Sequence, residues 1–438
     1  MKRHMSKGFM LLQRKSFLAM TVLVWLLVAC QPKVYLMPTP LVIGSGEADP
    51  FAANPSLEQT NSVPVLYATN RLPLGATDER TYTILPSDKL RLGVASLRIG
   101  KEDNAWDKLY LLSTTAEKDR RPLLYLENLE ELIAIGTDSE PVDLPPEATK
   151  FFKSVNAALK GSLDKDLLIY VHGANANVYR ATAQAAQYRH FTGRNSVVLA
   201  FAWPSAASLL KYGIDVINAQ TTYPVFARLI KLLARHTHAR YLNILAYSAG
   251  AQIASPGLAE LGQSASGDSR EQLRDQLRLG SIYFAAPDVD LKAFIDHLPR
   301  YADLARRVSI SININDFVLS LAEGHHGVSR AGRPNADELS LAERQWVVEA
   351  SNRSALDIID INSEDIPDLD KGAHSFWYDH PWVSSDVLML FMLQLGPAER
   401  GLQQNHSPKG TRYWTFPKDY PERVASRIRD LKAENREE

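Results

Sequence analysis

The segment Tyr241–Gly250 of this 438-residue chain has the sequence Tyr-Leu-Asn-Ile-Leu-Ala-Tyr-Ser-Ala-Gly. Its first half is an apolar, strand-like run, and a helical pattern begins directly after it. Ser248 stands between them, two residues after Ala246 and two before Gly250. Small residues at these positions let a serine occupy a tight strand-to-helix turn, because larger side chains would collide with the neighbouring strand and helix. The pattern predicts a nucleophile elbow with alanine in place of the usual first glycine; the alternative is a serine that only caps a buried helix.

Short apolar runs alternate with amphipathic segments on both sides of this turn. The runs are 167–171, 197–202, 241–245, 281–286, 308–314 and 356–361, and the helical segments lie near 148–160, 177–191, 219–236, 249–262 and 382–394. Strands buried on both faces read as continuous apolar runs, and strand–helix alternation is typical of a parallel sheet with helices on both sides. We therefore predict a doubly wound, mostly parallel α/β domain over 147–396.

The segments outside this domain have other patterns. The section 63–146 contains strand-like segments at 63–71, 90–98 and 109–113 without a clear helical pattern, so we predict antiparallel strands joined by loops. Residues 31–62 contain Pro, Gly, Ser, Asn and Gln without an apolar period, which predicts a tether. Residues 397–438 are charged and polar, which predicts a surface extension that ends in a helix.

Residues 1–30 have the pattern of a secretion signal. Basic residues occupy the first half, and Phe17–Ala29 is an uncharged apolar run that is too short for an ordinary membrane-spanning helix. The run ends in Leu-Val-Ala followed by Cys30, the only cysteine, which resembles a bacterial lipobox with Cys30 as the lipid-bearing residue. Gln31 follows where an Asp often signals inner-membrane retention, so we predict a periplasmic protein anchored in the outer membrane. The alternative is a plain signal peptide with an incidental cysteine.

The composition excludes several classes of protein. Hydrophobic residues make up 45% of the chain, as in a globular protein with a full core rather than a disordered chain. Lys plus Arg is 49 and Asp plus Glu is 50, so no excess of cations is available for nucleic-acid phosphates. A single cysteine excludes an internal disulfide and a cysteine-based zinc site.

A second motif lies where the apolar run 167–171 ends in His172-Gly173-Ala174-Asn175. It resembles the loop after the third strand of α/β-hydrolases, which donates a backbone N–H to an oxyanion hole. Glycine lets the main chain approach the substrate closely. We predict that Ala249, directly after the serine, supplies one N–H, and Ala174 or Asn175 the other. His172 precedes the serine, so we predict a structural role for it.

The partners of the serine are expected later in the chain, in the order Ser, acid, His. Asp316 ends the second apolar run after the turn, which is the usual place for the acid; Asp288 and Asp290 follow the intervening run and remain alternatives. His374 lies in the loop after 356–361 and is the predicted base, with His380 as a weaker alternative.

No cofactor is predicted, and no metal. The adjacent His325 and His326 with Glu323 form the best candidate ligand set, but adjacent histidines point in different directions and no third spacing supports them. We expect the two histidines in a surface or lid loop. Aromatic residues near these motifs could line an acyl pocket, although each is more typical of a core position; they are Trp203, Tyr247, Phe376, Trp377 and Trp382.

The motifs together resemble a bacterial α/β-hydrolase family catalogued as domain of unknown function 900. They occur in the order VLYATNR (65–71), YVHGAN (170–175), FAWPS (201–205), LAYSAG (245–250), FAAPDVD (284–290), IND (314–316) and GAHS (372–375), so the resemblance covers about 63–392. Members more often show HG-Φ-N and A-H-S-M-G, so this chain departs at Ala174, Tyr247 and Ala249 but keeps the serine. The resemblance implies the fold and leaves the substrate open.

Two functions from different classes follow. The first is a lipid-anchored serine hydrolase of the carboxylesterase or lipase type, acting on an acyl ester or lipid, with a peptidase or thioesterase also possible at the same site. The second is a non-catalytic envelope scaffold that uses 63–146 and 321–350 as a partner surface. Ser, acid and His positions in the expected order favour the enzyme.

Overall fold

The computed structural model describes residues 33–437, apart from 78–79, 102–105, 117–119, 137–143, 207, 264–266, 354, 362–363 and 365. The chain divides into two units, Met1–Val34 and Tyr35–Glu438, and the second contains the sheet and its helices. The predicted signal peptide and Cys30 lie outside the described residues. Every helix within the described residues is too short or too polar to cross a lipid bilayer.

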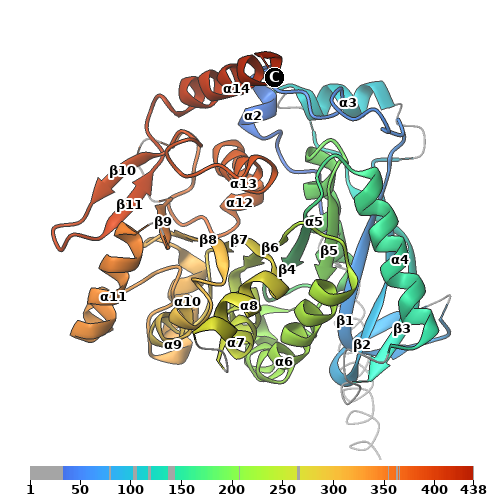
Figure 1. Ribbon diagram of the computed structural model, residues 1–438, viewed down its shortest axis with the longest axis horizontal. Helices are drawn as coiled ribbons and strands as arrows, with labels where there is room; N and C mark the ends of the chain where they lie inside the picture. The colour runs from blue at the N-terminus through green and yellow to red at the C-terminus, as the bar shows by residue number, and fades with distance from the viewer. Residues whose placement is uncertain are drawn as a thin grey trace, which may run out of the picture. The chain divides into compact units, whose positions relative to one another are not determined.

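An eleven-stranded sheet runs through the second unit (Figure 1) in the order β10-β11-β9-β8-β7-β6-β4-β5-β1-β2-β3. The strands are β1 Ser62–Leu74, β2 Thr81–Ile99, β3 Leu124–Gly136, β4 Leu167–Val171, β5 Val197–Phe201, β6 Leu242–Tyr247, β7 Leu279–Ala285, β8 Ala305–Ile312, β9 Asp357–Asp360, β10 Gln403–His406 and β11 Arg412–Thr415. The eight central strands, β11-β9-β8-β7-β6-β4-β5-β1, pair in parallel with their neighbours. At one edge β2 pairs antiparallel with β1 and with β3, and at the other edge β10 pairs antiparallel with β11. The mostly parallel α/β sheet with antiparallel N-terminal strands is confirmed.

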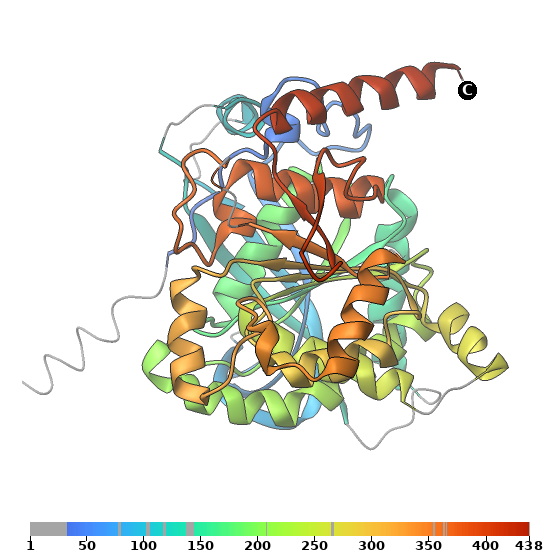
Figure 2. The same ribbon diagram turned by 90° about the vertical axis from the view of Figure 1, so that its left-hand side faces the viewer.

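Helices cover both faces of this sheet, and Figure 2 shows α13 and α14 on one side and α6, α9, α10 and α11 on the other. The helices are α2 Leu41–Gly44, α3 Trp106–Thr114, α4 Pro146–Gly161, α5 Val178–Phe191, α6 Tyr212–His236, α7 Ala251–Gly262, α8 Asp268–Leu277, α9 Leu291–His297, α10 Phe317–His326, α11 Leu341–Asn352, α12 Phe376–Asp379, α13 Pro381–Leu393 and α14 Tyr420–Glu437. Because of the two layers, every residue of β4, β5, β6 and β7 is buried. This double covering explains why these strands are continuous apolar runs in the sequence.

The order of the strands creates a crevice at one end of the sheet. β5 lies on one side of β4 and β6 lies on the other, so the connections after β4 and after β6 leave in opposite directions. The carboxyl ends of β4 and β6 therefore flank a topological switch point, which is where open α/β sheets bind ligands. The His172-Gly173 and Tyr247-Ser248 motifs follow these two strands directly.

The strand predicted at 109–113 is wrong, because these residues belong to α3. Leu109, Leu112 and Ser113 are buried at helical spacing, and a five-residue apolar run does not by itself distinguish a strand from a turn of helix. The strand β3 was also not predicted from the sequence. This strand is an edge strand, and most of its side chains stay partly exposed, which weakens the apolar signal.

The predicted tether is also wrong for the part of 31–62 that belongs to the second unit. Leu36, Val42 and Phe51 are buried, and α2 lies within this segment. Backbone N–H groups are bound as well: that of Val42 donates to the Ser385 hydroxyl at 2.9 Å. The apolar residues here have no regular period because the segment lies over the core as an irregular strap, so the sequence pattern gave no sign of burial.

Replacing Phe51 by alanine is expected to lower the free energy of unfolding by about 3–5 kcal/mol. Phe51 is 1% exposed and its ring contacts those of Trp106, Tyr110 and His190, with centroids 4.9–6.0 Å apart. Urea unfolding measures the change, and Leu85→Ala at a half-exposed position of β2 is the control, with an expected change within about 0.5 kcal/mol. Wild-type stability of Phe51→Ala would restore the tether interpretation.

The predicted surface extension 397–438 does end in a helix, α14, but much of it belongs to the body. β11 pairs in parallel with β9 and extends the sheet beyond 356–361, the last strand-like run identified in the sequence. Apolar side chains of this segment are buried in the core; they include Leu402, Trp414, Phe416, Tyr420 and Val424. Charged and polar residues make up most of the rest of this segment, so its composition gives no indication of their burial.

Candidate active site

Ser248 occupies a strained turn between β6 and α7. Its φ is +52°, a left-handed conformation that costs energy for any residue other than glycine and that persists where the surrounding structure enforces it. Packing requires glycine at position 250, because a Cβ there would lie 2.4 Å from the carbonyl oxygen of Val171. A Cβ on Gly173 would lie 2.9 Å from the Cβ of Ser248. The small residues of both motifs therefore let the two turns approach each other.

His374 lies beside Ser248 and joins it to Asp316. The Ser248 hydroxyl and Nε2 of His374 are 2.8 Å apart, and Nδ1 of His374 is 2.7 Å from Oδ2 of Asp316. The carboxylate is fully buried and requires a donor, so the imidazole proton belongs on Nδ1 and Nε2 accepts from the serine. The three side chains therefore form one continuous chain of hydrogen bonds.

Asp316 is held in place by the start of α10. It is the N-cap residue of this helix, and its Oδ1 accepts a hydrogen bond from the backbone N–H of Leu319 at 2.9 Å. One carboxylate oxygen thus caps the helix while the other faces His374. Ser248, Asp316 and His374 follow β6, β8 and β9 respectively, so the parallel strands deliver all three to the same edge of the sheet.

The alternative acids and the alternative base are engaged elsewhere. Asp288 is buried, accepts from Nε of Arg330 at 2.6 Å and accepts from the Tyr212 hydroxyl at 2.6 Å. Asp290 caps α9 through the N–H of Ala293. His380 caps α13, and its Nε2 donates to the carbonyl of Pro367 at 2.8 Å. The hydrogen-bond chain from Ser248 thus runs through His374 to Asp316.

Two other serine–histidine hydrogen bonds among the described residues lack either an open cavity or a carboxylate behind the histidine. Ser255 lies 3.2 Å from Nδ1 of His297, but it is fully buried within α7. Ser113 lies 2.8 Å from His190, whose other nitrogen faces the guanidinium of Arg194 rather than a carboxylate. A buried acid behind the histidine and an open cavity in front of the serine distinguish Ser248.

The residues predicted to form an oxyanion hole lie around Ser248. Ala249 is the second residue of the helical turn Ser248–Gly250, which continues into α7, and the first N–H groups of such a segment have no partner within the helix. Ala174 and Asn175 line the cavity opposite. Burial raises the pKa of Asp215 to about 6, although the backbone N–H groups of Ala206 and Asn175 act to lower it. The hydrogen bond to Asp215 comes from the N–H of Ala206, at 2.6 Å from Oδ1. Ala174 and Asn175 are therefore both candidates for the second oxyanion donor.

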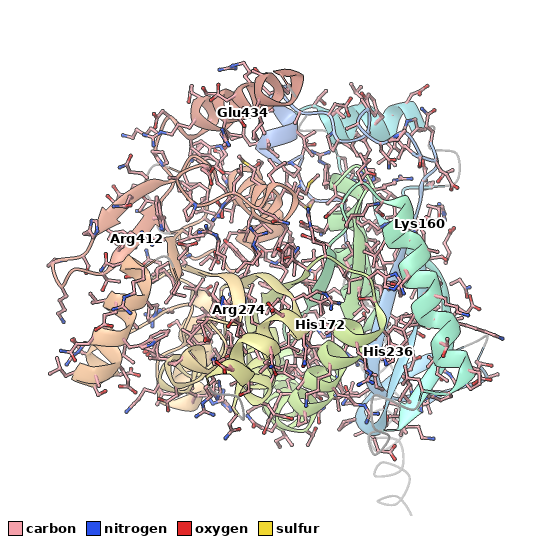
Figure 3. All side chains as sticks on the ribbon, in the orientation of Figure 1. Lys160, His172, His236, Arg274, Arg412 and Glu434 are labelled. Atoms are coloured by element: carbon pink, nitrogen blue, oxygen red, sulfur yellow. The ribbon has the colours of Figure 1, made fainter. Side chains whose placement is uncertain are left out.

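His172, labelled in Figure 3, is the first residue after β4 and is buried. Burial, followed by the charge of Arg71, lowers the pKa of His172 to about 3, so the ring is neutral at physiological pH. Its Nδ1 lies 2.7 Å from the carbonyl of Gly173, and its ring stacks on that of Trp203 at 5.3 Å. These contacts fix the turn after β4 and agree with the predicted structural role.

A cavity of about 530 Å³ opens above the serine. Its wall includes Ser248, His374, Tyr247 and the guanidinium-bearing Arg180. The centroids of the Tyr247 and His374 rings are 5.3 Å apart, so the tyrosine ring packs against the imidazole. The other aromatic residues predicted near the site belong to the core: Trp203, Phe376, Trp377 and Trp382 are buried and do not line the cavity. Sequence patterns gave no sign of Arg180, because a cation within a helix is usually exposed.

The histidine pair predicted in a loop forms the end of α10 instead. Nε2 of His326 lies 3.2 Å from the Tyr212 hydroxyl, and Glu323 pairs with Arg333. Across the part of the chain that the structure describes, no group of three or more His, Cys, Asp or Glu residues is arranged to hold a metal ion.

A mostly parallel sheet with helices on both faces and a serine on the turn after a central strand defines an α/β hydrolase. The chain belongs to the family described as alpha/beta hydrolase of unknown function (DUF900), whose model matches residues 147–383. This range runs from α4 into α13 and includes Ser248, Asp316 and His374, whereas 63–146, which we expected to share the resemblance, lies outside it. Comparisons with curated proteins and with solved structures gave no significant match.

Proposed function

We propose that this protein is a serine hydrolase that cleaves an ester or related acyl bond, as a carboxylesterase or a lipase does. The observation that carries the proposal is the chain of hydrogen bonds from Ser248 through His374 to the buried Asp316, at the floor of an open cavity. Family membership supports a hydrolase fold but leaves the activity open.

In the proposed reaction the Ser248 hydroxyl attacks the carbonyl carbon of the substrate while Nε2 of His374 takes its proton. Asp316 keeps the imidazole in the required tautomer and stabilises its cation. The N–H group of Ala249 and that of either Ala174 or Asn175 bind the developing oxyanion. His374 then protonates the leaving alcohol, and water releases the acid from the acyl-enzyme by the reverse sequence of proton transfers.

We further propose that Cys30 carries a lipid that anchors the protein to the bacterial envelope, on the periplasmic side of the outer membrane. The proposal depends on the sequence of residues 1–31, in which a basic region and an apolar run precede the only cysteine. The body packs from Leu36 onward, so the segment between the lipid and the body is much shorter than the tether predicted from composition.

The experiment is labelling with a fluorophosphonate probe, which reacts with activated serines. The chain from Gln31 to Glu438 contains every described residue and is the protein to use. We expect wild type to be labelled, and Ser248→Ala and His374→Ala to remain unlabelled while they keep the wild-type circular dichroism spectrum. Ser255→Ala is the matched control, because it removes another serine that contacts a histidine, and it should be labelled like wild type.

Failure of a folded wild type to react with the probe would reject the proposed hydrolase. A binding scaffold built on the hydrolase fold would then be the leading interpretation. Labelling that persists in Ser248→Ala would show that the activated serine lies elsewhere.

A further inference from the structure

We infer that the mouth of the Ser248 cavity docks on a lipid bilayer, from which the enzyme takes its acyl substrate directly. This inference deepens the proposed function and rests on it for the chemistry. The docking itself stands on a separate observation, which is the apolar surface around the mouth of the cavity.

Large apolar side chains at the mouth are exposed to solvent. Leu210 is 99% exposed, Phe317 is 64% exposed and Leu321 is 60% exposed, and all three line the cavity. Soluble proteins rarely gather exposed apolar side chains in one place unless that place binds a partner. Exposure of all three around the reactive serine therefore indicates an apolar partner at the mouth.

The apolar surface continues outward along the two segments that flank the mouth. Ile214 and Ile217 follow Leu210 at intervals of four and three residues, and they are 40% and 67% exposed. On the other side, Ile314 precedes Phe317 by three residues and is 51% exposed. Ile214 and Ile217 share one face of α6, and Phe317 and Leu321 share one face of α10, whereas Leu210 and Ile314 lie in the turns that lead into these helices. We call the six residues the apolar rim; they are Leu210, Ile214, Ile217, Ile314, Phe317 and Leu321.

The start of the second unit lies at the same end of the sheet. Tyr35 pairs with Leu123, and the carbonyl of the next residue, Leu124, accepts from the Tyr179 hydroxyl at 2.7 Å. Tyr179 is adjacent to Arg180, which lines the cavity. A lipid on Cys30 would be five residues before Tyr35, and five extended residues span at most about 17 Å. The proposed anchor would therefore hold this end of the molecule close to the membrane.

A bilayer is the partner that these observations favour over a second protein. The rim surrounds an opening rather than a flat face, and the cavity behind it has Ser248 at its floor. An acyl chain that leaves the bilayer through the rim would remain covered by apolar side chains until its ester reached the serine. Burial of apolar surface at the acyl boundary is also how peripheral proteins bind lipid.

The test is sedimentation with vesicles made of equal parts of phosphatidylethanolamine and phosphatidylglycerol. The protein is the chain from Gln31 to Glu438 with Ser248→Ala, so that turnover cannot alter the vesicles. We expect it to sediment with the vesicles. Leu210→Ser, Phe317→Ser and Leu321→Ser combined should lower the vesicle partition coefficient at least about tenfold, because serine removes the apolar surface that enters the membrane.

The matched control removes three other exposed leucines, which do not line the cavity. Leu74→Ser, Leu163→Ser and Leu341→Ser combined change side chains that are 55–67% exposed and should bind like the parent. Binding should also persist at high salt, because it depends on apolar contact. The docking inference fails if the parent does not sediment, if the rim variant binds as well as the parent, or if high salt releases the protein.

The lipid substrate is tested separately from the docking. Wild type should release fatty acid from the same vesicles, and the rim variant should release at least about tenfold less. If the probe labels wild type but no fatty acid appears, the hydrolase remains and the lipid substrate is rejected. If the Ser248→Ala protein docks but wild type is not labelled, the docking surface remains and the proposed function is rejected.

Discussion

Ser248→Ala and His374→Ala are each expected to lower kcat for a hydrolysed ester by roughly 10⁵- to 10⁶-fold, and the double variant to lower it no further. The reason is that the serine and the histidine act as one unit: without the base the hydroxyl is a weak nucleophile, and without the hydroxyl the base has no proton to accept. The hydrogen bond of 2.8 Å between Ser248 and Nε2 of His374 already has the geometry that this transfer requires.

The measurement is the hydrolysis rate of a soluble nitrophenyl ester for wild type, both single variants and the double variant. A residual rate above the uncatalysed one is expected, because the oxyanion donors and the cavity remain. If the rate of the double variant falls by the product of the two single factors, the two residues do not act as one unit. If His374→Ala keeps its activity, another group is the base.

Asp316→Asn is expected to lower kcat by about 10⁴-fold while the protein keeps its fold. Asparagine also caps helices well, so the hydrogen bond to the N–H of Leu319 can be kept. The loss arises at the other oxygen. An amide that donates to Nδ1 of His374 would favour the tautomer with its proton on Nε2, which cannot accept from Ser248.

Asp290→Asn is the matched control for this prediction. Asp290 caps α9 in the same way that Asp316 caps α10, through the N–H of the residue three positions later, but it does not contact His374. Thermal unfolding should show both variants to be folded, and only Asp316→Asn should lose activity. Equal loss in both variants would show that helix capping, rather than the carboxylate beside the imidazole, controls the rate.

The parallel core of the fold could be predicted because its local signals agree with its tertiary environment. β4, β5, β6 and β7 are buried on both faces, so almost every residue is apolar and each run is conspicuous in the sequence. The edges of the fold gave weaker signals. β3 is half-exposed, and α3 is short enough to resemble a strand.

The segments that flank the core were misjudged for a related reason. Composition describes the average surroundings of a segment, whereas burial depends on a few side chains that reach the core. Phe51 and Trp414 are such side chains, in stretches whose overall composition resembles that of a linker or a surface extension. Each packs only because the chain returns to the body from far away in sequence, which no local pattern reports.

For the candidate site, the sequence by itself determined the serine and its turn, because Ser248 needs small neighbours at positions fixed by a strand and a helix that adjoin it in the chain. The choice among Asp316, Asp288 and Asp290 was decided only by the tertiary structure. All three follow parallel strands and satisfy the order of acid before histidine, but only Asp316 reaches Nδ1 of His374, while Arg330 and Tyr212 hold Asp288. The apolar rim also needed the tertiary structure, since the exposure of Leu210 and Phe317 depends on what packs around them and not on their neighbours in sequence.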